Sequence, residues 1–340
     1  RHVRCDPTGP GSTQRTENSL IMATHPFKSF IPYLVNTARS DGYEQDHVAT
    51  DPSGGEWRRL GLVPPIKGEE LIIDLDGAGK VMAVQFNERI LPGKVRDEKL
   101  QIEVARLERL QGRKVGKKEY ALLRQQIEFE LLPKAFIRRT VVPVLFYKHE
   151  MGTQIMLVCT SSPKRAEDAV GVLRGVFGDD LMPWKIETES SVSGMLTTLA
   201  TSTAIDGDQW FAVGDSAVIK GDDKKAIRIK DTPVESKDVQ DLLTADGMHV
   251  VELAVAWGDE PDREPDLTFT VSGSLIFKRA ETIVKVTNSA EDFYGFAVIC
   301  LRTYRVMLTH FFELCGGIKE RRASGDSTHG SEDDGLCKGW

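Results

Sequence analysis

Residues 89–139 read RILPGKVRDEKLQIEVARLERLQGRKVGKKEYALLRQQIEFELLPKAFIRR, and this stretch decides the fold. It holds 14 Lys and Arg residues against 7 Asp and Glu residues, which gives it a net charge of +7. The whole chain carries −7, so the remaining residues carry −14. Because attraction to phosphates depends on where charge lies rather than on its sum, this asymmetry indicates a local surface for polyanions.

Two helices joined by a short basic turn are predicted within this stretch. Apolar residues recur at helical spacing over about 95–111, where Gly112 ends the pattern, and over 117–132, where Pro133 ends it. We expect the helices to form a hairpin that buries two apolar faces, made of Leu100, Val104, Leu107 and Leu110 or Ala105 on the first and Tyr120, Leu123 or Leu122, Ile127 and Leu131 on the second.

The turn at the tip of this hairpin is the first candidate site. It contains Arg113, Lys114, Lys117 and Lys118, with only Glu119 close by in sequence. Four cations at one turn keep a positive field, so we predict that they contact phosphates. The alternative is an ordinary solvated helix surface, since charges on helices are often paired four residues apart and acidic residues of the second helix partly neutralise it.

The rest of the chain predicts an α+β fold, with antiparallel sheets built from β-hairpins. Residues 71–75 and 80–86 flank a glycine turn, and residues 141–147 and 153–160 form a second pair. Ser162 is a candidate N-cap, with Pro163 at the first helical position of the next helix. Further strands are expected at 217–220, 226–230, 250–257, 267–271 and 275–278.

The domain organisation is predicted from composition. Residues 1–24 form a disordered N-terminal extension, with Met22 as a candidate start, and residues 318–340 form a disordered tail. Between them, 25–317 is expected to be the folded region that carries the polyanion-binding surface, with 25–90 and 140–180 as a central subdomain, 91–139 as the helical arm and 181–317 as a second α+β subdomain. The acidic loop 258–266 is expected to be mobile.

Composition excludes several classes of protein. The five cysteines form no Cys-x-x-Cys pair, which argues against a disulfide framework or a thiolate zinc site and favours a reducing cytoplasm. Residues 293–314 are apolar, but Arg302, Arg305, His310 and Glu313 interrupt them, so a buried helix is expected rather than a membrane span. No P-loop, nucleophile elbow or zinc-protease motif is present.

Two alternative functions stay open at this point. A carboxylate two residues before a lysine can hold a metal ion and orient water, as in metal-dependent nucleases, and this pattern occurs in 97–99, 222–224 and 235–237. A chain with 28% charged residues also produces such triplets by chance. The second alternative is a protein-interaction scaffold whose basic turn binds an acidic partner.

Two further groups of residues are candidates for binding. Arg138 and Arg139 follow the arm, and Arg228 and Lys230 lie on a predicted strand. The residues alone place Phe136, between Pro133 and Arg138, in the core.

The order of several motifs resembles the RdgC family of bacterial recombination-associated proteins. The resemblance runs from about residue 26 to residue 317 and rests on the segments 26–30, 61–65, 89–92, 131–136, 164–168, 226–230, 251–257 and 273–279. It implies a non-enzymatic DNA-binding homodimer, without cofactors, that closes as a ring around duplex DNA and restrains recombinase-driven strand exchange. A cytoplasmic, nucleoid-associated location and a recombinase filament as a partner follow from the same resemblance.

The resemblance also implies roles for individual residues. Phe136 occupies the aromatic position of the Leu-Leu-Pro-x-Ala-Phe motif, which contributes to the contact that closes the ring. Arg228 and Lys230 match a basic strand of the other contact region or the inner surface. Here the chain departs from the family pattern, because Asp231 and Thr232 follow Lys230 where a further lysine and a glutamine are typical.

Overall fold

The fold is known from a computed structural model. It describes residues 26–36, 43–149, 153–178, 181–201, 210–221, 225–244, 247–258, 264–282 and 290–319. The predicted N-terminal extension, most of the predicted tail and the centre of the acidic loop therefore lie outside the described residues. Ile318 pairs with Thr188, and the Lys319 amide donates to the Glu187 carbonyl at 2.8 Å.

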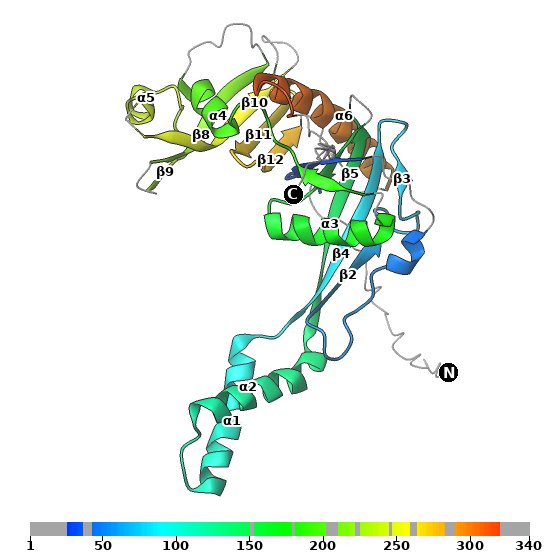
Figure 1. The fold of residues 1–340 in the computed structure, drawn as a ribbon, viewed down its shortest axis with the longest axis vertical. Helices are drawn as coiled ribbons and strands as arrows, with labels where there is room; N and C mark the ends of the chain where they lie inside the picture. The colour runs from blue at the N-terminus through cyan, green and yellow to red at the C-terminus, as the bar shows by residue number, and fades with distance from the viewer. Residues whose placement is uncertain are drawn as a thin grey trace, which may run out of the picture.

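The first sheet is antiparallel throughout and forms the centre of the molecule (Figure 1). Its strand order is β2-β4-β5-β6-β1-β7, and β3 pairs with β4. The strands are β1 (Ile31–Val35), β2 (Arg58–Val63), β3 (Ile73–Asp74), β4 (Lys80–Ile90), β5 (Phe136–Lys148), β6 (Gln154–Val158) and β7 (Pro183–Lys185), and the 3-10 helix η1 (Tyr43–His47) precedes β2.

One face of this sheet is covered by α3 (Pro163–Phe177). The Ser162 hydroxyl accepts the Arg165 amide hydrogen, so the predicted N-cap is confirmed. Alternate residues of β4 and β5 face the helix, where Met82, Val84 and Val144 pack against its buried stripe of Ala166, Ala169, Val170, Leu173 and Val176. The buried residues recur at helical spacing on α3 and at every second position on the strands, and their packing fixes α3 to the sheet.

The second sheet is also antiparallel, with the order β12-β11-β10-β8-β9. It is built from β8 (Phe211–Lys220), β9 (Ala226–Ile229), β10 (His249–Trp257), β11 (Leu267–Ser272) and β12 (Phe277–Thr282). Two helices accompany it, α4 (Val192–Thr201), which packs on β10, and α5 (Lys237–Leu243). The strand β9 is one edge of this sheet.

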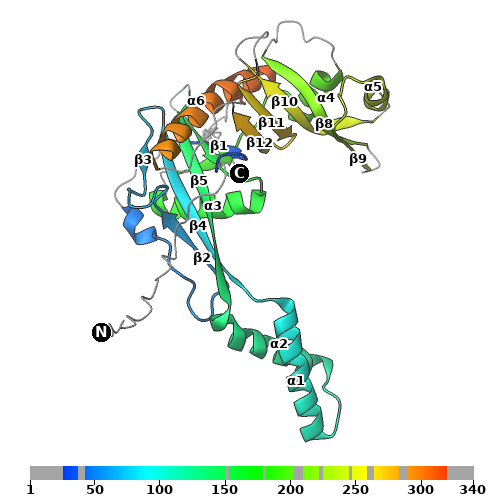
Figure 2. The same cartoon turned by 180° about the vertical axis from the view of Figure 1, so that it is seen from behind.

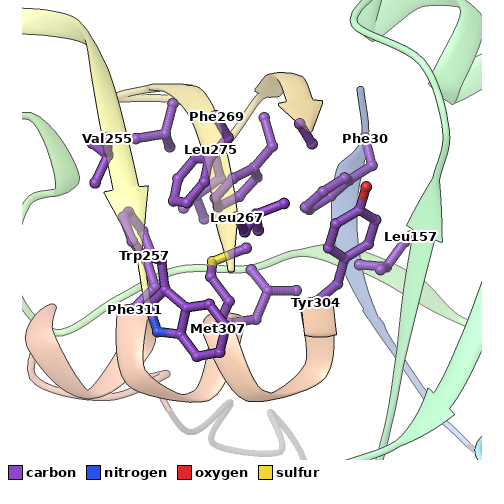
Figure 3. Close-up of a cluster of buried hydrophobic side chains, with 14 of the residues drawn as sticks. Phe30, Leu157, Val255, Trp257, Leu267, Phe269, Leu275, Tyr304, Met307 and Phe311 are labelled. Carbon is purple, nitrogen blue, oxygen red and sulfur yellow. The ribbon is translucent and has the colours of Figure 1, made fainter. Parts of the chain in front are cut away.

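The long helix α6 (Ala290–Leu314) joins the two sheets into one core (Figure 3). Its Tyr304, Met307 and Phe311 lie between Phe30 and Leu157 of the first sheet side and a group from the second sheet that includes Val255, Trp257, Leu267 and Phe269. The buried Tyr304 hydroxyl donates to the Phe27 carbonyl at 3.0 Å, which satisfies the polar group of an otherwise apolar centre. The apolar segment 293–314 is thus a buried helix, as its sequence predicts.

The strands β4 and β5 form a ribbon that carries the chain out of the body and into an arm, and β2 pairs with β4 along this ribbon as far as Glu88 (Figures 1 and 2). β4 and β5 pair from Lys80 opposite Phe146 to Ile90 opposite Phe136. Between these strands lie α1 (Gly93–Gln111), α2 (Lys117–Leu131) and the 3-10 turn η2 (Leu132–Lys134). The arm is therefore an insertion at the end of a hairpin, and both of its connections to the body pass through the ribbon.

The α+β class, the hairpins and the arm helices are confirmed, with six α-helices in the described residues. One strand prediction is shifted, since residues 275 and 276 precede β12, which begins at Phe277 and continues to Thr282. The Ser- and Thr-rich stretch after Trp184 contains α4, which the sequence left undefined, and α5 was not predicted. The domain boundaries remain a prediction.

Gly79, in the turn between β3 and β4, provides a test of the packing of α6. A Cβ at this position would lie 2.0 Å from the Phe146 carbonyl oxygen and 2.7 Å from Leu301 Cδ2. Since the backbone of β5 cannot yield, Gly79→Ala is expected to lower the free energy of unfolding by about 1–3 kcal/mol in urea denaturation. Gly55→Ala, where no neighbour lies within 4 Å, is the control. Equal stability of the two variants would contradict the close approach.

Candidate nucleic-acid interface

The turn between α1 and α2 is built by one arginine–carboxylate clamp. Gly112 adopts a left-handed conformation (φ 66°) that ends α1. The Arg113 guanidinium then donates to both Glu119 carboxylate oxygens, at 2.8 and 2.5 Å, and Glu119 also accepts the Gly116 amide hydrogen at 3.0 Å. Arg113 thus organises the turn, and its charge is offset by Glu119.

Unlike Arg113, the three lysines of the turn have no carboxylate partner among the described residues. Lys114, Lys117 and Lys118 are exposed, and within the described part of the chain none of them forms an ion pair. A second acidic residue, Glu108, faces the turn and accepts the Val115 amide hydrogen at 3.1 Å. Of the four cations predicted to contact phosphates, three therefore present free ammonium groups to solvent, and the fourth holds the turn that presents them.

The clamp predicts a pH dependence of the turn. The hydrogen bonds from Arg113, and then from the Gly116 amide, lower the pKa of Glu119 from 4.5 to about 2. A carboxyl whose pKa is lowered by folding stabilises the folded turn above pH 4.5, and this contribution is lost as the pH falls toward 2. A carboxyl chemical-shift titration of Glu119 should show a midpoint near 2, and Arg113→Gln should return it toward 4.5. A midpoint near 4.5 in the parent would refute the clamp.

Ion pairs also connect the two helices of the arm. Arg96 on α1 donates to Glu128 on α2 at 3.1 Å and Lys99 on α1 pairs with Glu130 on α2, while Arg124 donates to Glu128 within α2 at 3.4 Å. These pairs lie near the surface, where each contributes about 0–1 kcal/mol. They fix the register of the hairpin more than they stabilise it.

The predicted apolar faces of the arm are covered only in part, since Val104, Leu107, Leu123 and Leu131 are half-buried, whereas Tyr120 and Leu110 are exposed. Only Leu100 on α1 and Ile127 on α2 are buried, together with Leu132 at the end of the arm. Two helices that stand away from the body can cover one narrow strip on each other and no more. The arm therefore exposes a set of large apolar side chains: Val95, Ile102, Leu110, Tyr120, Leu122 and Phe129.

Phe136 is the most exposed large apolar residue in the described chain, with 84% of its surface accessible. It begins β5 directly after the arm and lies opposite Ile90, which is also exposed. The interpretation of Phe136 as a core residue is wrong. Exposed aromatic side chains in an apolar patch are typical of protein–protein contacts.

Arg138 and Arg139 lie on opposite faces of the ribbon, because successive strand residues alternate. Arg138 pairs with Glu88 at 2.8 Å, and Glu88 also contacts Arg165 of α3 at 3.5 Å. Arg139 pairs with Asp51 at 2.9 Å. Both arginines are partly exposed, but their carboxylate partners offset more of their charge than the sequence suggests. Their role in binding phosphates stays a prediction.

Arg228 and Lys230 are exposed at the edge strand β9 and just beyond it. Neither is ion-paired with any residue that the structure describes. In both views β9 lies at the far end of the molecule from the arm (Figures 1 and 2). A single chain therefore does not bring these two cations together with the lysines of the turn.

The carboxylate–lysine triplets do not converge on a metal site where the structure describes them. Lys99 pairs with Glu130 and Asp97 with Arg96, whereas residues 222–224 lie outside the described residues. Among the described residues, no group of three or more His, Cys, Asp or Glu side chains is arranged to hold a metal ion. No described helix has the length and apolar character needed to cross a membrane.

Comparisons with known proteins place this chain in a family. The family model described as "Putative exonuclease, RdgC" matches residues 45–294. A protein of Pseudomonas syringae pv. syringae named "Recombination-associated protein RdgC" is 31% identical over 289 residues, covering 79% of this chain and 90% of the relative. A protein of the same name from Pseudomonas fluorescens is 32% identical over 240 residues, covering 70% of this chain and 74% of the relative. This chain therefore belongs to the RdgC family.

Proposed function

We propose that this chain is a recombination-associated DNA-binding protein, and that two copies close into a ring around duplex DNA and limit the access of a recombinase. The observation that carries the proposal is the layout of the arm. It places the unpaired Lys114, Lys117 and Lys118 at the tip of one protruding element, and the exposed Phe136 at its root.

The charges favour binding to the DNA backbone rather than to particular bases. The three lysines of the turn are point charges on flexible stems, which suit phosphates and read no sequence. The acidic remainder of the chain, at −14, repels DNA from other surfaces, so the polyanion is directed to the cationic elements. Arg138, Arg139, Arg228 and Lys230 add charge along the same path in this proposal.

The elongated shape supports closure by two copies. One chain has an exposed apolar contact at the root of the arm and an open sheet edge at β9, in separate parts of the molecule. A two-fold axis that passes through both contacts would join two such chains into a closed ring. In that arrangement Phe136 belongs to one contact, and the edge with Arg228 and Lys230 lies near the other.

A cytoplasmic, nucleoid-associated location accompanies this proposal, with a recombinase filament as the competing occupant of the DNA. The family description as an exonuclease makes a metal-dependent nuclease the second candidate. It would use one of the carboxylate–lysine triplets, of which Glu235 and Lys237 are exposed at the start of α5.

Two assays on the same duplexes distinguish these functions. Fluorescence anisotropy with two unrelated duplexes of equal length should give similar affinities that weaken steeply with salt. The same duplexes, incubated with protein and Mg²⁺ and run on a denaturing gel, should remain intact. Degradation would establish the nuclease instead, and the absence of binding at low salt would favour the protein-interaction scaffold. A strong preference for one duplex would overturn backbone-only recognition.

A further inference from the structure

Arg89 occupies the point at which the ribbon passes into the arm. It is the penultimate residue of β4 and lies opposite Ile137 of β5. Its Nη1 donates to the Leu132 and Pro133 carbonyls, at 3.0 Å each, and its Nη2 donates to the Pro52 carbonyl at 2.8 Å. All three acceptors are backbone carbonyls, and Arg89 has no carboxylate partner among the described residues.

Two of these carbonyls belong to η2, the turn that ends the arm. Carbonyl groups at the end of a helix lack their usual partners, and a cation there also interacts favourably with the helix dipole. Phe136 follows this turn after a single residue, Ala135. The Arg89 guanidinium thus holds the turn that sets the direction of both the arm and Phe136.

The third carbonyl belongs to a loop that braces the ribbon, residues 49–57. Three consecutive residues of this bracing loop are bound by three residues of the ribbon. Asn87 Nδ2 donates to the Thr50 carbonyl at 2.9 Å, Arg139 pairs with Asp51, and Arg89 binds Pro52. The loop also approaches Pro133, since a Cβ at Gly54 would lie 3.9 Å from Pro133 Cγ. Arg89 is the residue that contacts the ribbon, the loop and the arm together.

One donor of the Arg89 guanidinium group has no hydrogen-bond partner within the described chain. Arg89 Nε is buried and makes no hydrogen bond. A buried donor without a partner destabilises the folded chain, so the arrangement persists because the other donors reach three carbonyls at once. Lysine keeps the charge but lacks the planar fork, so it cannot bind the same carbonyls together.

We propose that Arg89 is a positioning residue, which holds the arm and Phe136 at a fixed angle to the body. Its relevance to ring closure rests on the proposed function, but the fixed angle itself does not. Substituting Arg89 should release the arm as a unit, with its helices intact, while the two sheets and α6 keep their packing.

The test is a distance distribution between spin labels on the arm and on α3. Labels are introduced with Gln111→Cys and Arg174→Cys, both at exposed positions, in a background with Cys5→Ser and Cys337→Ser. The three remaining cysteines, Cys159, Cys300 and Cys315, are buried. Dilution with excess unlabelled protein removes distances between copies. The parent should give one narrow distribution, and Arg89→Met should give one at least about twice as wide.

Two further variants keep this test decisive. Arg59→Met removes a neighbouring arginine that binds Glu56 of the bracing loop but not the arm, so its distribution should stay narrow. Arg89→Lys should broaden the distribution while keeping the charge, and it decides the matter if Arg89→Met does not fold. Tryptophan fluorescence monitors the body, because the arm contains no tryptophan. A distribution as narrow as the parent's in the folded Arg89 variants would overturn the proposal.

DNA binding separates this inference from the proposed function. Arg89→Lys should lose salt-resistant retention on DNA while still binding DNA at low salt through the lysines of the turn. If the distribution broadens and retention is unchanged, Arg89 positions the arm, but retention on DNA does not depend on the fixed angle. If the parent forms the ring but the distribution does not broaden in the variant, the positioning role alone fails.

Discussion

Phe136→Ser is expected to weaken self-association by roughly 30-fold or more while leaving the unfolding midpoint nearly unchanged. An aromatic anchor at the centre of a contact typically contributes at least about 2 kcal/mol to association, which corresponds to such a factor. In the single chain the side chain is 84% exposed, so its truncation removes little packing. Sedimentation equilibrium gives the association constant, and urea denaturation gives the free energy of unfolding.

Phe129→Ser is the matched control for this prediction, because the same residue type is exposed on the same arm. If Phe136 is the anchor, the control should associate considerably more strongly than Phe136→Ser. An unfolded Phe136→Ser variant would restore the interpretation as a core residue. A folded variant that associates as the parent does would remove Phe136 from the contact.

Changing Lys114, Lys117 and Lys118 together to glutamine should reduce both the affinity for DNA and its dependence on salt. Each phosphate contact releases counterions and contributes about 0.9 to the slope of log K against log salt concentration, so three contacts account for about 2.7 per arm. The loss should be equal for unrelated duplexes, because contacts to phosphate carry no sequence information. Fluorescence anisotropy over a series of salt concentrations measures both quantities.

The control for the lysine variant removes the same charge elsewhere. Lys148, Lys185 and Lys237 are exposed outside the arm, and their joint change to glutamine alters the net charge equally. Similar losses of slope in the two variants would show that total charge, and not the turn, governs binding. An unchanged slope in the arm variant would place the DNA contacts on other residues.

Local signals explain which parts of the fold the sequence predicts. The helices of the arm end where Gly112 and Pro133 stand, and α3 begins at a serine cap followed by proline, so their boundaries follow from single residues. By contrast, α4 follows Ser191, whose hydroxyl accepts the Gly194 amide hydrogen at 3.4 Å, but in a stretch rich in Ser and Thr this one serine does not mark a helix start in the sequence. Its helical state depends on burial of Met195, Leu196 and Leu199 against the second sheet, which is tertiary information.

The sequence predicts which residues belong to the site, but not which ion pairs and hydrogen bonds they form. The sequence identifies the four cations of the turn, and Glu119 is close enough along the chain to be noticed. Arg139 pairs with Asp51, which lies 88 residues away, and Arg89 binds carbonyls up to 44 residues away. Periodicity also predicts a buried face on each arm helix, and the two helices cover these faces only in part, because the arm projects from the body and has no further partner within one chain.

The most direct test of the ring is retention on DNA of different topology. Protein is bound to a closed circular plasmid, to the same plasmid cut once, and to the cut plasmid with bulky blocks at both ends, and is then challenged with high salt. A ring around duplex DNA predicts retention on the circle and on the blocked linear form and loss from the free-ended form. Equal loss from all three would contradict encirclement and leave a protein that binds DNA from one side.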